Sequence, residues 1–198
     1  MSNFLSVPES LSAPRTDASN RVSTSSRESE QFLRFHLVPD TTALLPIQQV
    51  TEVLTIPRGQ IVPIFQMPAW VMGVYNWRGE ILWIVDLGHL VGLTPWYEQA
   101  ISASAYKAVV LQARSNQAAA TNVKSQMLGL VVNRIEDIES CNPDWIQSAP
   151  SSTISPELAQ FLRGYWLTSN GDMLAVLESQ AILAAMPKNP VSADQNSY

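Results

Sequence analysis

The chain has 198 residues, of which 46% are hydrophobic and 15% charged, so it can bury a sizeable core. Its formal net charge of −5 argues against a nucleic-acid-binding protein, because phosphate backbones are bound by clustered Lys and Arg. The single cysteine, Cys141, permits no internal disulfide, and no apolar run reaches the roughly 20 residues that span a bilayer. We therefore expect a soluble cytoplasmic protein.

The two ends of the chain differ in composition from the middle. Residues 1–30 are rich in serine and show no apolar periodicity, so we expect a disordered tail whose deletion leaves stability nearly unchanged. Residues 188–198 are polar and are predicted to form a second tail. The ordered domain is thus expected over 31–187.

The first half of the domain predicts short strands at 32–38 and 43–47, with Pro46 at an edge or bulge. Residues 48–54 fit either a short helical turn or extended chain. Pro57, Gly59 and Pro63 predict an extended surface loop over 56–65. Residues 67–70 are predicted to form a short helical turn, with Pro68 near its first position.

A β-hairpin is predicted next, because apolar runs at Val71–Tyr75 and Ile81–Val85 flank a short polar break that contains glycine. The second run does not alternate polar with apolar residues, so both faces are expected to be buried, with Trp83 in the core of the first barrel. Arg78 is the only cation for about twenty residues on either side. A guanidinium held out to solvent on a rigid hairpin is a candidate recognition feature.

The remaining elements are read from apolar runs and their flanking turn residues. Short helices are predicted at 87–92, before Pro95, and at 179–186; Ser155 and Pro156 open another helix that reaches about Leu162. Strands are predicted at 106–112 and at 127–133, the second continuing over 135–138, and a long hairpin loop at 113–125 joins them. A further hairpin is predicted from strands at 164–168 and 173–177.

Three blocks recur in the same order, roughly ninety residues apart. The segment 79–86 aligns with 171–178, since each has Gly, an acid, five apolar residues and a second acid. The two other pairs of blocks are 73–75 with 164–166 and 45–53 with 130–138. We therefore predict an all-β protein with a few short helices, in which an internal repeat forms two small five-stranded β-barrels with a groove between them.

The search for catalytic chemistry finds little. His36, His89 and Cys141 lie in no metal-ligand or nucleophile pattern, and no cofactor is expected. Asp86 and Glu178 end equivalent strands, where capping the following helices is the favoured role. A hydrolase or transferase that uses either acid in the groove stays open as the alternative, and an oligonucleotide-binding double barrel is opposed by the charge.

A group of acids follows the predicted strand at 127–133. Glu136, Asp137, Glu139 and Asp144 lack the spacing of a calcium-binding loop, so a solvated edge is the favoured interpretation.

The hairpin also carries a resemblance to a known family. Residues 72–87, MGVYNWRGEILWIVDL, are similar to the G-V-x-N-x-R-G-x-I-x-P-I-V-D-L block of CheW-like domains, the adaptors of bacterial chemotaxis signalling. Pro68, the segment 129–132 and the segment 146–150 match the family as well, and the resemblance covers about 31–187. Trp83 replaces the family's proline, Gly88 an arginine and Asn133 an aspartate, and these departures concern which receptor and kinase are served.

The resemblance implies two packed five-stranded barrels and a non-enzymatic scaffold that links a CheA-type histidine kinase to the cytoplasmic tips of methyl-accepting chemoreceptors. The Trp-rich hairpin is similar to adaptors of phototaxis and pilus-motility systems, whose photoreceptors would take the receptor's place. The receptor-contact positions that the family implies are Arg78 with its turn neighbours Asn76 and Trp77, Val50 and Glu52, and Ala108 in the strand expected to face the groove.

Overall fold

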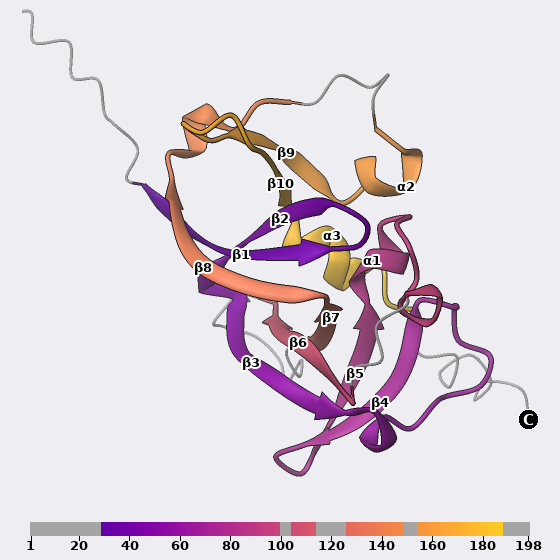
Figure 1. Cartoon of the computed structure of the whole chain (residues 1–198). Coiled ribbons are helices and arrows are strands. Elements are labelled where there is room, and N and C mark those ends of the chain that lie inside the picture. The colour runs from indigo at the N-terminus through magenta and orange to yellow at the C-terminus, as the bar shows by residue number, and fades with distance from the viewer. Residues whose placement is uncertain (1–28, 100–103, 114–125, 149–153, 188–198) are drawn as a thin grey trace, which may run out of the picture.

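The computed structural model describes residues 29–99, 104–113, 126–148 and 154–187. These residues form two five-stranded sheets, one above the other in Figure 1, as the sequence predicted. The first sheet has the order β8 (Arg134–Cys141), β1 (Glu30–Leu37), β2 (Thr41–Pro46), β10 (Met173–Leu177), β9 (Leu162–Leu167). The second has the order β3 (Val50–Pro57), β6 (Ala105–Gln112), β7 (Met127–Val132), β5 (Glu80–Asp86), β4 (Val71–Trp77).

The helices are short, and none in the described ranges has the length and apolar character needed to cross a membrane. The α-helices are α1 (Leu87–Leu90), α2 (Pro156–Ala159) and α3 (Ser179–Ala184). The 3-10 helices are η1 (Ile47–Gln49), η2 (Arg58–Gln60), η3 (Trp96–Glu98) and η4 (Pro143–Trp145). The predicted tails and most of the predicted loop at 113–125 lie outside the described residues.

The duplicated halves exchange strands between the two sheets. The strands β1 and β2 of the first half join β8, β9 and β10 of the second half, whereas β6 and β7 join β3, β4 and β5. Strands of different halves pair antiparallel at β1–β8 and β3–β6 and parallel at β2–β10 and β5–β7, and the latter two are the only parallel pairings in the described part. Each repeat therefore does not form its own sheet, although strands that align in sequence occupy the same rank in the two sheets.

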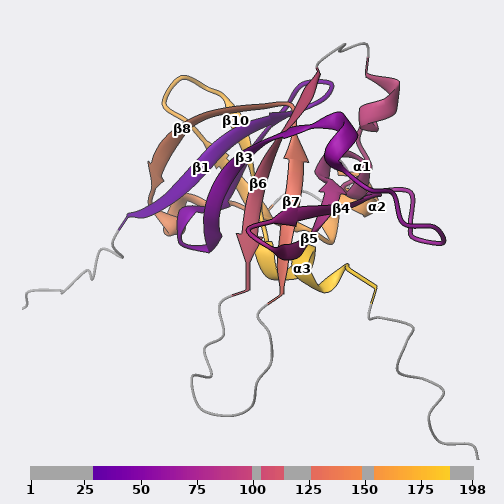
Figure 2. The ribbon, with the colours of Figure 1, turned by 90° about the horizontal axis from the view of Figure 1, so that it is seen from below.

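Three apolar clusters account for the long non-alternating runs. The central cluster takes side chains from one face of each sheet and from α1 and α3. The ribbon views show where these helices and the two sheets lie (Figures 1 and 2). The other two lie on the opposite faces, one per sheet. In β6, for example, Ala108 and Val110 face the second sheet's own cluster, while Val109 and Leu111 face the central one. Central strands are thus buried on both faces, which removes the usual alternation.

Two expectations for β5 need correction. Ile81 is 72% exposed, so the run is not buried throughout. Trp83 is half-buried and packs against the central cluster, outside the curl of the second sheet, because its direction alternates with that of Leu82 and Ile84. The residues 67–70 form turns without a helix, and β3 continues through Pro57 into what was predicted to be loop.

Backbone contacts at equivalent positions support the duplication. Asp86 and Glu178 cap α1 and α3 as predicted, since their carboxylates accept from the N–H groups of His89 and Gln180. The N–H of Asp86 donates to the carbonyl of Trp70 at 2.9 Å, and that of Glu178 donates to the carbonyl of Phe161 at 2.7 Å. Such agreement in hydrogen bonds is expected of two copies of one folding pattern.

Candidate functional site

The β4–β5 hairpin ends in a two-residue turn made of Arg78 and Gly79. Their φ angles of 55° and 82° are both positive, as a type I′ turn requires. The first position of such a turn usually holds Asn or Gly, because a larger side chain is strained there. The Oδ1 atom of Asn76 accepts a hydrogen bond from the N–H of Gly79 at 3.0 Å, which steadies the turn. The long cationic side chain of Arg78 is thus placed on a fixed backbone.

The guanidinium of Arg78 has two partners, which corrects the expectation of a cation standing alone in solvent. Its Nη2 lies 2.7 Å from the Oε2 of Glu52, and its Cζ lies 4.9 Å from the centre of the Trp77 ring. The Arg78 side chain is still 67% exposed and that of Glu52 32%, so the ion pair contributes only about 0–1 kcal/mol to stability. Solvent and other proteins can therefore reach both charges.

This ion pair joins the two edges of one sheet. Glu52 belongs to the edge strand β3, and Arg78 follows the opposite edge strand β4, although 26 residues separate them in sequence. The sheet must curl for its edges to meet. Trp77, between the pair and the apolar cluster inside the curl, packs against that cluster. The charged tip is consequently tied to the core through one aromatic ring.

The two remaining predicted contact residues, Val50 and Ala108, lie in different surroundings. Val50 begins β3 and packs, partly buried, against the central cluster, two residues from Glu52. Ala108 is 0% exposed and faces the inside of the curled sheet, not the groove between the sheets as predicted. Since no surface of Ala108 is accessible, we propose no direct contact through it.

Ile81 is a further candidate site residue that the sequence analysis did not name as such. It lies opposite Asn76 across the hairpin and is 72% exposed, so it adds apolar surface beside the Arg78 turn. Its position in the sequence could have indicated this, because Ile81 is the second residue of β5, close to the turn, where a strand extends past the core and its side chains are exposed.

Asp86 and Glu178, the two acids of the alternative enzyme hypothesis, accept hydrogen bonds from backbone N–H groups. The carboxylate of Asp86 accepts from the N–H of Trp96 at 2.8 Å and from that of His89 at 3.2 Å. Burial raises the pKa of Asp86, and these two hydrogen bonds partly oppose that shift. Asp86 lines a cavity of about 220 Å³ with Arg58, Tyr106 and Lys107, but Glu178 does not, so this cavity holds no carboxylate pair.

Other reactive groups show no catalytic arrangement within the described residues. No group of three or more His, Cys, Asp or Glu side chains there could hold a metal ion. Cys141 is 1% exposed, and burial raises the pKa of its thiol to about 11. His36 lies on a strand, as predicted, and its side chain also belongs to an ionic network with Glu136, described below.

Comparisons with known proteins agree with the hairpin resemblance. Residues 31–186 match the family model described as the CheW-like domain. The chain is 30% identical over 118 residues to a probable chemotaxis protein CheW of Rhizobium etli, and 28% identical over 120 residues to the chemotaxis protein CheW of Rhizobium meliloti. These alignments cover 59% and 61% of this chain, and 65% and 67% of the relatives, so the first spans just under two thirds of its relative.

A solved structure has the same fold. The crystal structure of the scaffolding protein TtCheW from Thermoanaerobacter tengcongensis superposes with a TM-score of 0.59, covering 76% of this chain and 89% of that one. The sequence identity is 20%, so this likeness bears on the fold.

Proposed function

This chain belongs to the CheW-like domain family, and from that premise we propose that it is a non-enzymatic adaptor coupling a CheA-type histidine kinase to chemoreceptors. The kinase and the receptor would bind different surfaces, with the receptor at the turn of Arg78. A phototaxis receptor would use the same surface through the same chemistry.

The observation that carries the proposal is the Arg78–Glu52 pair on its rigid turn. A long side chain on a residue in the left-handed backbone conformation contributes little to the stability of the fold, but the fixed backbone sets the direction in which its charge points. One terminal nitrogen of Arg78 meets Glu52, and the guanidinium has further N–H donors for a partner. A receptor tip that exposes carboxylates and carbonyls suits such a planar donor better than it suits an ammonium.

The neighbouring residues extend this surface. Trp77 stacks beneath the guanidinium, and the exposed Ile81 lies across the hairpin from Asn76. Interfaces commonly combine an arginine and aromatic anchors with apolar surface, and only a few such residues supply most of the binding energy. We propose Arg78, Glu52 and Trp77 as the centre of the receptor contact, with Val50 and Asn76 supporting it.

The experiment measures two affinities on one purified variant. Arg78→Glu should weaken binding of a soluble chemoreceptor cytoplasmic fragment by at least about tenfold, or roughly 1.4 kcal/mol. Binding of the kinase should be unchanged, because it uses another surface. The circular dichroism and melting curve should stay close to those of the parent, since the pair is exposed.

Arg163→Glu is the matched control. Arg163 also forms a partly exposed ion pair, with Glu30 at 3.0 Å, but on the first sheet, and its reversal should leave receptor affinity unchanged. Receptor affinity equal to that of the parent in a folded Arg78→Glu protein would overturn the assignment. The double variant with Arg78→Glu and Glu52→Arg restores an ion pair but exchanges the positions of its two charges. Receptor binding should stay weak in this variant if the receptor needs the positive charge on the turn, and should recover if it needs only the pair.

A further inference from the structure

The chain crosses between the sheets at two equivalent places, and the second crossing is fastened to β1. There β7 leaves the second sheet at Val132, and β8 enters the first at Arg134. The N–H of Asn133, between them, donates to the carbonyl of His36 at 3.0 Å. Because β8 is an edge strand, β1 is its only neighbour in the sheet. Contacts of His36 therefore hold both the crossing and the start of an edge strand.

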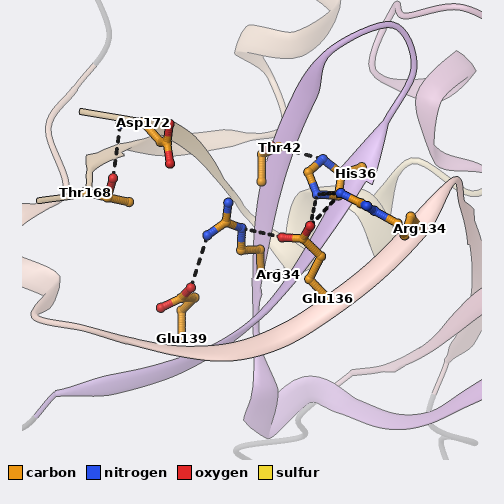
Figure 3. Close-up of polar contacts among 8 residues, drawn as sticks. All are labelled: Arg34, His36, Thr42, Arg134, Glu136, Glu139, Thr168 and Asp172. Atoms are coloured by element: carbon orange, nitrogen blue, oxygen red, sulfur yellow. Dashed lines mark hydrogen bonds and ion pairs between the residues drawn. The ribbon is translucent and has the colours of Figure 1, made fainter. Parts of the chain in front are cut away.

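The side chain of His36 lies at the centre of an ionic network (Figure 3). Its Nε2 is 2.6 Å from the Oε1 of Glu136, and its Nδ1 is 3.2 Å from the Oγ1 of Thr42 on β2. Arg134 Nη2 lies 2.6 Å from the same Glu136 oxygen and 3.1 Å from the His36 Nε2. The imidazole thus joins three strands through polar contacts.

The second carboxylate oxygen of Glu136 completes the network. Oε2 is paired with the Nε of Arg34 at 2.8 Å, and the Nη1 of Arg34 reaches Glu139 at 3.2 Å (Figure 3). The acidic edge was predicted to be solvated, but Glu136 and Glu139 are instead paired with basic side chains, and they supply the negative charges of an ion-pair network between β1 and β8. The side chains of His36 and Glu136 are 22% and 25% exposed.

The duplication provides a natural comparison for this network. In the aligned repeats, His36 corresponds to Gln112 and Glu136 to Thr51. At the first crossing these equivalents form a neutral contact, with Thr51 Oγ1 3.3 Å from Gln112 Oε1. One position in the fold thus holds an uncharged pair in one copy and a titratable pair in the other.

We propose that His36 and Glu136, with Thr42, form a proton-sensitive clasp that tightens the β7–β8 crossing when the imidazole is protonated. Imidazole is the side chain whose charge ordinarily changes between about pH 5 and 8. In the neutral form, Nε2–H donates to Glu136 and Nδ1 accepts from the Thr42 hydroxyl. When a proton binds Nδ1, the same hydroxyl accepts from it, so the heavy atoms keep their places while the bond to Glu136 becomes charge-assisted.

The charges around the imidazole set the direction of the effect. Glu136 favours the protonated ring, and Arg134, on the same strand, opposes it, while Arg34 is occupied by Glu136 and Glu139. The hydrogen bond from His36 lowers the pKa of Glu136; desolvation opposes this shift, and the charges of His36, Arg34 and Arg134 add to it, so this carboxylate stays ionised above its usual range of titration. The attraction is therefore present at the lower pH and is lost as the pH rises and the ring is deprotonated.

The test is amide hydrogen exchange of the full chain at pH 6 and pH 8, after correction for intrinsic exchange rates. Protection of the Asn133 N–H should be at least about threefold greater at pH 6, as expected for a partly exposed ion pair. Its chemical shift should titrate with the same midpoint as the ring signal of His36, one of only two histidines in the chain. The N–H of Val74, bonded to Val62 at 2.9 Å in the second sheet, is the internal control and should show no such change.

Transplanting the neutral pair gives the matched variant. In His36→Gln combined with Glu136→Thr, the pH effect at Asn133 should disappear while the control amide is unaffected. Equal protection of Asn133 at the two pH values in the parent protein would overturn the proposal, as would a pH effect that persists in the folded double variant. The comparison of two amides within the parent protein holds even if the variant does not fold.

Discussion

At the scale of single residues, environment decides which reactive groups are available to solvent. Arg78 is strained in its backbone yet exposed in its side chain, and Asn76 and Trp77 hold it in place. Cys141 is the opposite case: its thiol is 1% exposed in the cluster of the first sheet, with Sγ 3.3 Å from the carbonyl of Asn142. The first arrangement suits contact with a partner, and the second suits packing.

Cys141 should therefore resist alkylation in the folded protein. With a pKa of about 11, the thiol is almost entirely protonated at pH 8, and the thiolate is the reactive form. We expect labelling by iodoacetamide at pH 8 to be at least about a hundredfold slower in the native protein than in the denatured chain. Mass spectrometry over time measures the two rates.

Ser140→Cys in a Cys141→Ala background is the control, since Ser140 is exposed one position away on β8. That variant should be alkylated rapidly while folded. Equally rapid labelling of native Cys141 would mean that the first sheet opens there.

At the scale of elements, two glycines allow a loop to approach the edge strand of each sheet. Gly73 in β4 has a φ of 139°, and a Cβ there would lie 2.2 Å from the carbonyl oxygen of Val62. At the equivalent Gly164 in β9, a Cβ would lie 2.6 Å from the carbonyl oxygen of Gln147. In both places a backbone bridge, Val62 with Val74 and Gln147 with Tyr165, partly covers the edge. Covering an edge strand in this way limits its pairing with other chains.

Gly73→Ala should destabilise the protein by about 2–4 kcal/mol, because the clash is with backbone and the φ is unfavourable for alanine. Urea unfolding monitored by tryptophan fluorescence measures the change. Gly59→Ala is the control, because a Cβ at Gly59 meets nothing within 4 Å. Similar unfolding midpoints for the two variants would show that β4 and the Val62 loop separate easily.

The sequence predicted these elements well where the signal was local. The hairpin turn, the caps at Asp86 and Glu178 and the strands of the two parallel pairings follow from turn residues and apolar runs. The direction of a side chain in a strand buried on both faces does not follow, because Ala108 and Val109 are both apolar but face different clusters. For the same reason Trp83 was placed on the wrong side of β5. The Arg78–Glu52 pair was also beyond local reasoning, since it depends on the curl of the whole sheet.

At the scale of the whole molecule, the repeated halves are intertwined. Each sheet needs strands from both, and the parallel seams β2–β10 and β5–β7 are made only when the halves meet. Aligned blocks reveal a duplication, but they do not state with which copy a strand pairs, and this is why the sequence suggested one barrel for each repeat. We therefore expect the molecule to fold and unfold as a single cooperative unit.

A fragment of residues 29–103 should consequently not fold alone, because it lacks the three strands that complete the first sheet and the two that complete the second. Its far-UV circular dichroism should be that of an unfolded chain, as should that of 104–187. Mixing the two fragments should restore the β-sheet spectrum. A cooperative melting transition in either fragment by itself would contradict the intertwined arrangement.

The central claim, that this CheW-like chain joins a receptor to a kinase through separate surfaces, is tested most directly by reconstitution. An immobilised CheA-type kinase is mixed with a soluble chemoreceptor fragment, with and without the chain. We predict that the chain increases the receptor fragment retained on the kinase, and that Arg78→Glu removes this increase while the variant itself stays bound. Receptor retention that is unchanged by the chain, or supported equally by the Arg78→Glu variant, would contradict the account.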